Sequence, residues 1–150
     1  SHPRRLELQV RPLLENARAV ATTSDGLAVT EHLVLRPFPG ADENDADAYI
    51  DPAVFPELFA QDVPKQIAKT MAASQRPGAI AALRTASGEP AWESIPSWYM
   101  VAKHDRIIPP EAERFMAERA DATTVEVRTS HVPMITASGA VTSLIIAAAR

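Results

Sequence analysis

The sequence predicts an α/β fold with a small, mostly parallel sheet, flanking helices and a helical cap. The apolar run from Trp98 to Ala102 has the length and composition of a buried strand, and a second strand is expected over 124–127. A helical pattern follows each strand. Strands that alternate with helices are typical of parallel β–α–β units. We therefore expect two adjacent parallel strands near the end of the chain.

Length and composition describe an ordinary globular domain. The chain has 150 residues, of which 46% are hydrophobic and 23% charged, with a formal net charge of -4. A mildly acidic protein without a basic stripe is a poor partner for nucleic acid or for an anionic membrane surface. No apolar run reaches the roughly 18 residues of a membrane span. The absence of cysteine excludes disulfides and thiolate metal sites and favours a cytoplasmic location.

The first predicted segment covers residues 1–48. A helix is expected from Pro12 to Thr22, because an interior proline would interrupt any longer helix. Residues 23–26 form a turn signal, and the partly alternating run from Leu27 to Leu35 predicts a strand. Residues 41–48 are rich in carboxylates and contain no large apolar side chain, which predicts a solvated linker.

The second predicted segment, residues 49–90, is a cap or lid of short helices. Asp51 followed by Pro52 is a helix-start signal, and the sequence around Pro64 starts a second helix. A third short helix is expected over 79–85. The buried face of the second helix is predicted to consist of Ile67, Met71 and Ala72.

The third predicted segment, residues 91–150, is a βαβα unit. Its first helix opens at Pro109 or Pro110, with Glu111 and Glu113 in the first turn, where acidic groups complement the helix dipole. Ser138 is the expected cap of the last helix. The apolar positions of the two helices are Ala112, Phe115, Met116 and Ala120, and Val141, Leu144, Ile145 and Ala148.

Asp105 and His131 are the candidate catalytic residues. Each follows a predicted parallel strand, and the carboxyl ends of such strands meet at one edge of a sheet. In acyl transfer, a carboxylate holds a histidine in one tautomer so that its other nitrogen accepts a serine proton. The alternative is that Asp105 caps a turn and His131 bonds a loop.

Other polar residues are weaker candidates for a catalytic or metal-binding role. His104 should point to the opposite side from Asp105, and His32 is expected to be a half-exposed strand residue. The histidines lack the spacing of a metal site, so no metal and no cofactor is predicted. The chain has no G-x-S-x-G or comparable turn, and its serines lie in turns or at element ends. We therefore expect no nucleophilic serine within this chain.

Three stretches carry a resemblance to a known family. They are Ser74–Pro77 (SQRP), Pro90–Tyr99 (PAWESIPSWY) and Ala102–Pro110 (AKHDRIIPP), followed by Phe115–Ala120 (FMAERA) and Ser130–Met134 (SHVPM). From about Asp51 to Arg150 the chain resembles the C-terminal half of an α/β-hydrolase, in the branch of hydroxynitrile lyases and methyl-ester esterases. The resemblance implies that Asp105 is the triad acid, that His131 is the triad histidine and that residues 51–88 roof the pocket.

The resemblance has a clear limit. In the family, a preceding half supplies the serine and the oxyanion hole, and residues 1–40 of this chain do not resemble that half. The first hypothesis is an esterase-type hydrolase acting on a small apolar ester, incomplete here because the serine elbow is absent. The second is a non-catalytic small-molecule-binding or assembly module. The third is direct acid–base chemistry by His131 with Asp105. An exposed sheet edge would favour a homodimer in either of the first two cases.

Overall fold

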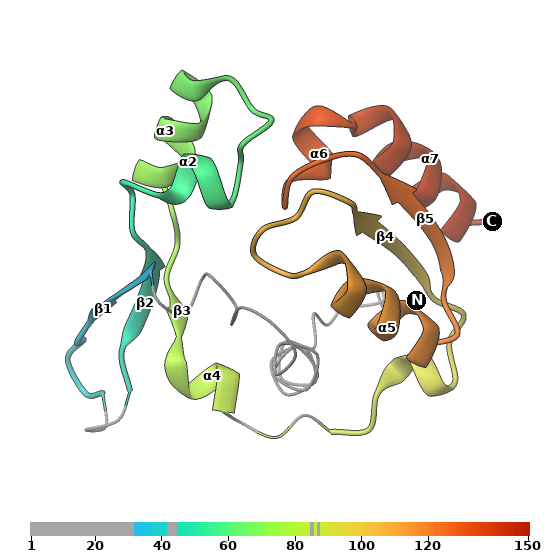
Figure 1. Ribbon diagram of the computed structural model, residues 1–150. Coiled ribbons are helices and arrows are strands. Elements are labelled where there is room, and N and C mark those ends of the chain that lie inside the picture. The colour runs from blue at the N-terminus through green and yellow to red at the C-terminus, as the bar shows by residue number, and fades with distance from the viewer. Residues whose placement is uncertain (1–31, 42–44, 85, 87) are drawn as a thin grey trace.

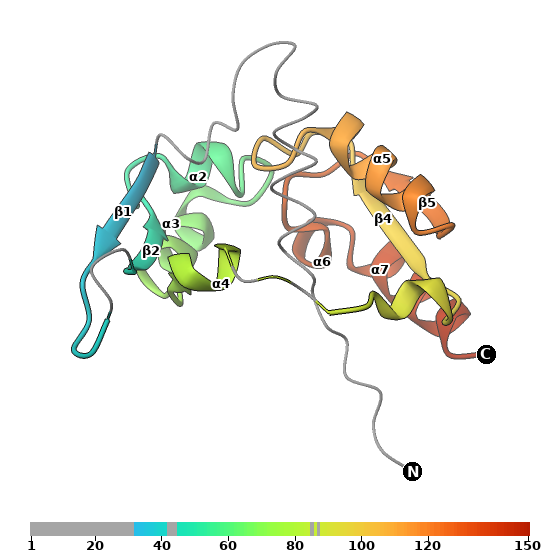
Figure 2. The ribbon, with the colours of Figure 1, turned by 90° about the horizontal axis from the view of Figure 1, so that it is seen from below.

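The computed structural model describes residues 32–41, 45–84, 86 and 88–150. The helix predicted over 12–22, the turn over 23–26 and the first half of the strand predicted over 27–35 lie outside these residues. Figures 1 and 2 show that the described chain forms two parts side by side, one built on an antiparallel sheet and one on a parallel sheet.

The first part, hereafter the antiparallel part, combines a three-stranded sheet with short helices. Its strands lie in the order β1–β2–β3, both pairs antiparallel, with Leu33 opposite Ile50 and Asp47 opposite Ala79. Its elements are β1 (Leu33–Arg36), β2 (Asp47–Ile50), α2 (Phe55–Leu58), α3 (Lys65–Ala73), β3 (Gly78–Ala79) and α4 (Ile80–Arg84).

The second part, hereafter the parallel part, is the predicted βαβα unit. Strands β4 and β5 are parallel, with Trp98 opposite Thr123 and Ala102 opposite Val127, so both end at the same edge. Its elements are η2 (Ala91–Glu93), β4 (Trp98–Ala102), α5 (Pro110–Arg119), β5 (Thr123–Val127), α6 (Pro133–Thr136) and α7 (Ser138–Ala148). Fold class and strand positions are thereby confirmed.

Prolines and one aspartate explain where the helices begin. Pro110 occupies the first turn of α5 and Pro64 the N-cap of α3, positions that tolerate the missing N–H. Asp51 accepts hydrogen bonds from the backbone N–H of Ala53 through Oδ1 and of Phe55 through its carbonyl oxygen. The first turn before α2 is thus satisfied locally, as the sequence predicts.

The main apolar cluster joins the two parts. Val132, directly after His131, is 4% exposed and packs in a cluster with Phe55 and Val63 of the antiparallel part. Ala60, Ala68 and Ala72 complete the buried set. Burial of apolar surface at this junction fixes the histidine loop of the parallel part against α2 and α3.

Several predictions of detail are wrong. Residues 47 and 48, expected in a linker, belong to β2, and the antiparallel sheet was not foreseen. Ser138 is the first residue of α7 rather than its cap, which is Ala137. Two residues predicted to be buried are exposed, Ile67 (49%) and Phe115 (44%), and the apolar Ile145 is 62% exposed. Among the described residues, no helix is long and apolar enough to cross a membrane.

Candidate active site

Asp105 lies in the tight loop after β4, and backbone groups of this loop bond one of its two carboxylate oxygens. Oδ1 accepts hydrogen bonds from the backbone N–H groups of Ile107 (2.7 Å) and Ile108 (3.1 Å). The residue is 6% exposed. The run of apolar residues in β4 buries the strand, and the strand end delivers this carboxylate to a fixed place. Oδ2 is left for another partner.

That partner is His131, in the loop that follows β5. Its Nδ1 lies 2.6 Å from Oδ2 of Asp105, although 26 residues separate them in the sequence. Because a carboxylate can only accept, Nδ1 carries the proton in this contact. The neutral imidazole then has its lone pair on Nε2, as a general base requires.

The charge of Asp105 is favoured despite burial. Burial alone would raise its pKa, but the hydrogen bond and charge of His131 and the backbone bonds of Ile107 and Ile108 together lower the pKa below its usual value. Asp105 is therefore ionised at neutral pH. A buried carboxylate fixed in this way stabilises the imidazolium that forms when His131 takes a proton.

The other side of the His131 ring is accessible. Its side chain is 27% exposed, and within the described part of the chain Nε2 makes no hydrogen bond. The ring of Phe59 meets it edge to face, with centroids 4.6 Å apart and an interplanar angle of 60°. Phe59 therefore forms an apolar wall beside the candidate base.

The segment 57–62 of the antiparallel part ties together the loops of the acid and the histidine. Oδ2 of Asp62 accepts hydrogen bonds from the backbone N–H of Ser130 (2.9 Å) and from Oγ1 of Thr136 (2.8 Å). Gln61 donates to the carbonyl oxygen of His104, and Arg106 donates to that of Glu57. Sequence reasoning missed this connection, since nothing local marks a partner some 70 residues away.

Glu113 is a buried acid that the sequence did not single out. It is 5% exposed, and its Oε2 accepts the backbone N–H of Ala102 at 2.7 Å. Burial raises the pKa of Glu113 to about 8, and its side-chain hydrogen bond with Asp105 and the charge of Asp105 act in the same direction, against the Ala102 bond and Arg114. Glu113 is thus largely neutral at pH 7. Glu113 lies in the first turn of α5, as predicted, but its carboxyl group also bonds the end of β4.

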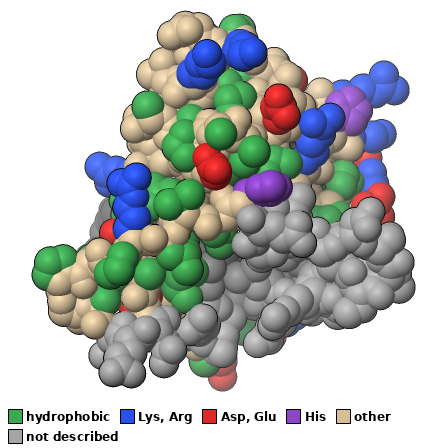
Figure 3. Space-filling model, turned by 60° about the vertical axis from the view of Figure 1, so that its left-hand side comes forward, with side chains coloured by type: hydrophobic (Ala, Val, Ile, Leu, Met, Phe, Trp, Pro, Cys, Tyr) green, Lys and Arg blue, Asp and Glu red, His purple; other side chains and the backbone are tan. Residues whose placement is uncertain are grey.

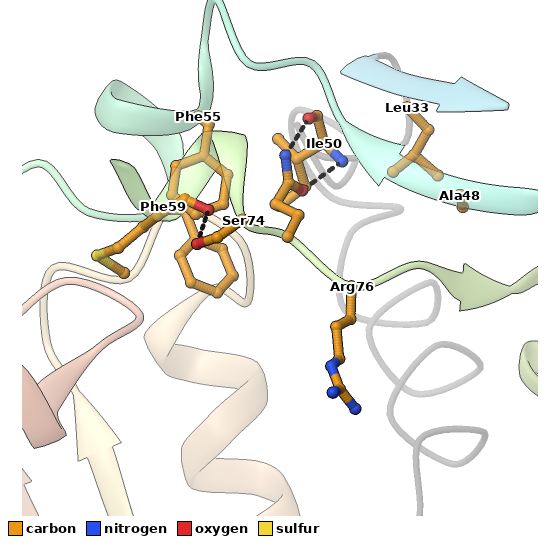
Figure 4. Close-up of a pocket in the computed structure, with 9 residues that line it drawn as sticks. Leu33, Ala48, Ile50, Phe55, Phe59, Ser74 and Arg76 are labelled. Carbon is orange, nitrogen blue, oxygen red and sulfur yellow. Dashed lines mark hydrogen bonds between the residues drawn. The ribbon is translucent and has the colours of Figure 1, made fainter. Parts of the chain in front are cut away.

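Two cavities lie near the pair, and the pair lines one of them. One, of about 440 Å³, lies in the antiparallel part and includes Phe59, with Arg76 at its other end (Figure 4). The other, of about 480 Å³, includes Asp105, His131 and Glu113 and runs along β4 beside Trp98 and Met100. Figure 3 views the molecule from the side of the antiparallel part and shows hydrophobic side chains distributed over that face.

The remaining sequence candidates stay apart from this chemistry. His104 is exposed and takes part through its backbone, and His32 is half-buried as expected but lies directly before β1 instead of within the strand. Ser130 is 0% exposed, so its hydroxyl is closed to a substrate. No group of three or more His, Asp or Glu among the described residues could hold a metal ion.

Comparison with known proteins identifies a family for this chain. The model of the "Alpha/beta hydrolase family" matches residues 8–143. The match begins far before residue 40, so the expectation that residues 1–40 stand outside the resemblance is wrong. No curated protein matches.

Solved structures give the same fold. One, polyneuridine aldehyde esterase, is similar with a TM-score of 0.69 and 14% identity over 89% of this chain and 54% of its own. A mutant of that esterase is similar with a TM-score of 0.61 and 15% identity, over 81% of this chain and 50% of its own. The chain thus spans about half the length of these structures. Since the family model covers most of the chain, this protein belongs to the alpha/beta hydrolase family.

Proposed function

We propose that this chain supplies the acid and the base of an esterase-type hydrolysis. The contact of 2.6 Å between Nδ1 of His131 and Oδ2 of Asp105, at the shared end of two parallel strands, is the observation that carries the proposal. Asp105 holds the ring in the Nδ1–H tautomer, and Nε2 takes the proton of the attacking hydroxyl. His131 then returns that proton to the leaving alcohol.

The nucleophilic serine comes from outside the described residues in this proposal. Two features of the parallel part support a larger sheet. Among the described residues β4 pairs only with β5, and α7 is rich in apolar side chains yet has no buried residue. Ile145 and Ile146 are 62% and 47% exposed on that helix. Further strands beside β4 and a layer over α7 would bury these groups and bring a serine to Nε2.

The cavity of about 440 Å³ is our proposed site for the apolar group of a small ester. Its wall includes Phe55, Phe59 and Met71, and the ring of Phe59 contacts that of His131. An apolar group held there would lie next to the base. In this proposal the antiparallel part acts as the cap predicted from the sequence over residues 49–90, enlarged by β1 and β2.

Hydrolysis of p-nitrophenyl acetate by the protein that contains this chain and its serine-bearing half tests the proposal. We expect His131→Ala to lower kcat by roughly 10³-fold or more. The matched control is His104→Ala, whose side chain is exposed, and it should stay within about twofold of the parent. Equal losses in both variants, or no loss in His131→Ala, would refute the role of His131.

A fluorophosphonate probe tests the position of the nucleophile. It reacts with serines activated by a neighbouring base. We expect no labelling of the 150 residues alone and labelling of the complete protein. Labelling of the isolated chain would show that one of its own serines is the nucleophile.

Assembly is the second candidate function, and the open side of β4 favours it. An unpaired strand edge is a template for another strand. A homodimer that pairs two β4 edges would close both of them. Light scattering should then give twice the monomer mass, and a monomer would exclude this candidate. The lack of cysteine supports a cytoplasmic location for either function.

A further inference from the structure

The end of β4 has a backbone N–H that the sheet does not use. Lys103 donates its N–H to the carbonyl oxygen of Val127 on β5 at 2.8 Å. Successive N–H groups of a strand point to opposite sides, so that of Ala102 points away from β5. Oε2 of Glu113 accepts a hydrogen bond from this N–H at 2.7 Å. Glu113 therefore stands where the next strand would otherwise bond, three residues before Asp105.

The same carboxyl group faces the catalytic acid. Glu113 and Asp105 are both buried and line the same cavity, and the neighbouring carboxyl group of Asp105 helps burial to raise the pKa of Glu113. Two carboxyl groups can hydrogen-bond to each other only with a proton between them, because an ionised carboxylate can only accept. The proton belongs to Glu113, since Asp105 is already bonded to His131 and two backbone N–H groups.

We propose that Glu113 is a positioning residue for the catalytic pair: in its neutral form it donates a hydrogen bond to Asp105 while it accepts one from the end of β4. The proposal rests on the catalytic role proposed for Asp105 and His131. Its consequence is a continuous chain of hydrogen bonds from the Ala102 N–H through Glu113 and Asp105 to His131.

Ionisation of Glu113 would break this chain. Loss of its proton removes the donor to Asp105 and puts a second negative charge beside it. Four charged or titratable groups surround Glu113: Tyr99 on β4, Asp105 in the next loop, His131 beyond Asp105, and Arg114 on its own helix. Tyr99 is neutral, because burial and the two nearby acids raise its pKa above the ordinary value. Arg114 offsets only part of the new charge, since it pairs with Glu126 on β5 at 2.7 Å.

The test uses the His131 ring as the reporter. Ring resonances of ¹⁵N- and ¹³C-labelled histidine are followed against pH in the intact protein and assigned by their absence from His131→Ala. The resonances of the His131 ring should move in a step with a midpoint near the pKa of Glu113, about 8. That step should vanish in Glu113→Gln, which keeps an acceptor for Ala102 and a donor for Asp105. It should remain in Glu111→Gln, the matched control on the exposed side of the same helix turn.

Kinetics provide a second readout. Glu113→Leu should lower kcat by about 10- to 100-fold with KM within about twofold, and Glu113→Gln should restore most of the rate. A step near pH 8 that persists in Glu113→Gln, or is absent from the parent protein, would overturn the proposal. The spectra need no turnover, so a protein that hydrolyses no ester would refute the proposed function and leave this test intact.

Discussion

Asp62 and Ser130 are 68 positions apart in the sequence, yet the Asp62 carboxylate accepts the backbone N–H of Ser130 at 2.9 Å. The bond joins the antiparallel part to the residue directly before His131. The same Oδ2 also accepts the hydroxyl of Thr136 on α6. The position of the candidate base therefore depends on a loop between α2 and α3, and not only on its own strand.

Asp62→Ala should loosen the histidine loop. We expect a loss of about 1 kcal/mol in the free energy of unfolding, since Asp62 is largely exposed and its bonds compete with water. Asp62→Asn should lose less, because its amide oxygen still accepts. Urea unfolding measures both. A loss as large in Asp51→Ala, whose side chain bonds only within its own turn, would show that Asp62 has no special role.

Acid should weaken the same connection. Desolvation would raise the pKa of Asp62, but the hydrogen bonds from Ser130 and Thr136 outweigh it and lower the pKa below 3.8. A lowered carboxyl pKa contributes stability that is present above the unfolded value and lost as pH falls through the folded value. The difference in stability between the parent and Asp62→Asn should therefore shrink below about pH 4. A difference that is constant down to pH 2 would contradict this.

The pKa shift of Glu113 has the opposite sign to that of Asp62. Its folded pKa of about 8 is above the ordinary value of 4.5 for a glutamate. Stability present below pH 4.5 is thus lost as pH rises from about 4.5 to 8, because the unfolded chain releases the proton first. Glu113→Gln removes this dependence, so its Tm relative to the parent should rise between pH 5 and pH 8.5. A relative Tm that does not change over this range would show that Glu113 titrates normally.

Phe59→Ala should alter substrate selection more than folding. Removing the ring enlarges the cavity of about 440 Å³ and takes away the wall beside His131. Longer p-nitrophenyl esters should gain in kcat/KM relative to the acetate. Phe115→Ala, which removes an exposed ring on α5, is the control and should leave the preference unchanged. An identical preference in both variants would place the ester elsewhere.

The sequence predicted the parallel part almost to the residue, for physical reasons. The apolar run ending at Ala102 and the proline at the first turn of α5 act locally, and the structure follows them. The same holds for the proximity of Asp105 and His131, because parallel strands end together. The resemblance to α/β-hydrolases pointed to the same two residues.

The structural features that the sequence did not predict depend on contacts between residues far apart in the chain. Strand β2 begins in an acidic segment, and β3 has two residues, so neither has a strand pattern of its own. Glu113 looks like an ordinary helix-start acid until β4 is placed beside it. Ile145 is one of the apolar positions of α7, but within the described chain no element covers it. Periodicity identifies an apolar face without identifying what covers it.

The tautomer of His131 tests the central claim most directly. The ¹⁵N shifts of its two ring nitrogens, recorded on the neutral ring, distinguish a protonated Nδ1 from a protonated Nε2. Our account predicts that Nδ1 carries the proton in the parent protein and that Asp105→Asn, which turns this acceptor into a donor, disturbs that preference. A parent protein with the proton on Nε2, or with the two forms mixed as in a free imidazole, would show that Asp105 does not prepare His131 to act as a base.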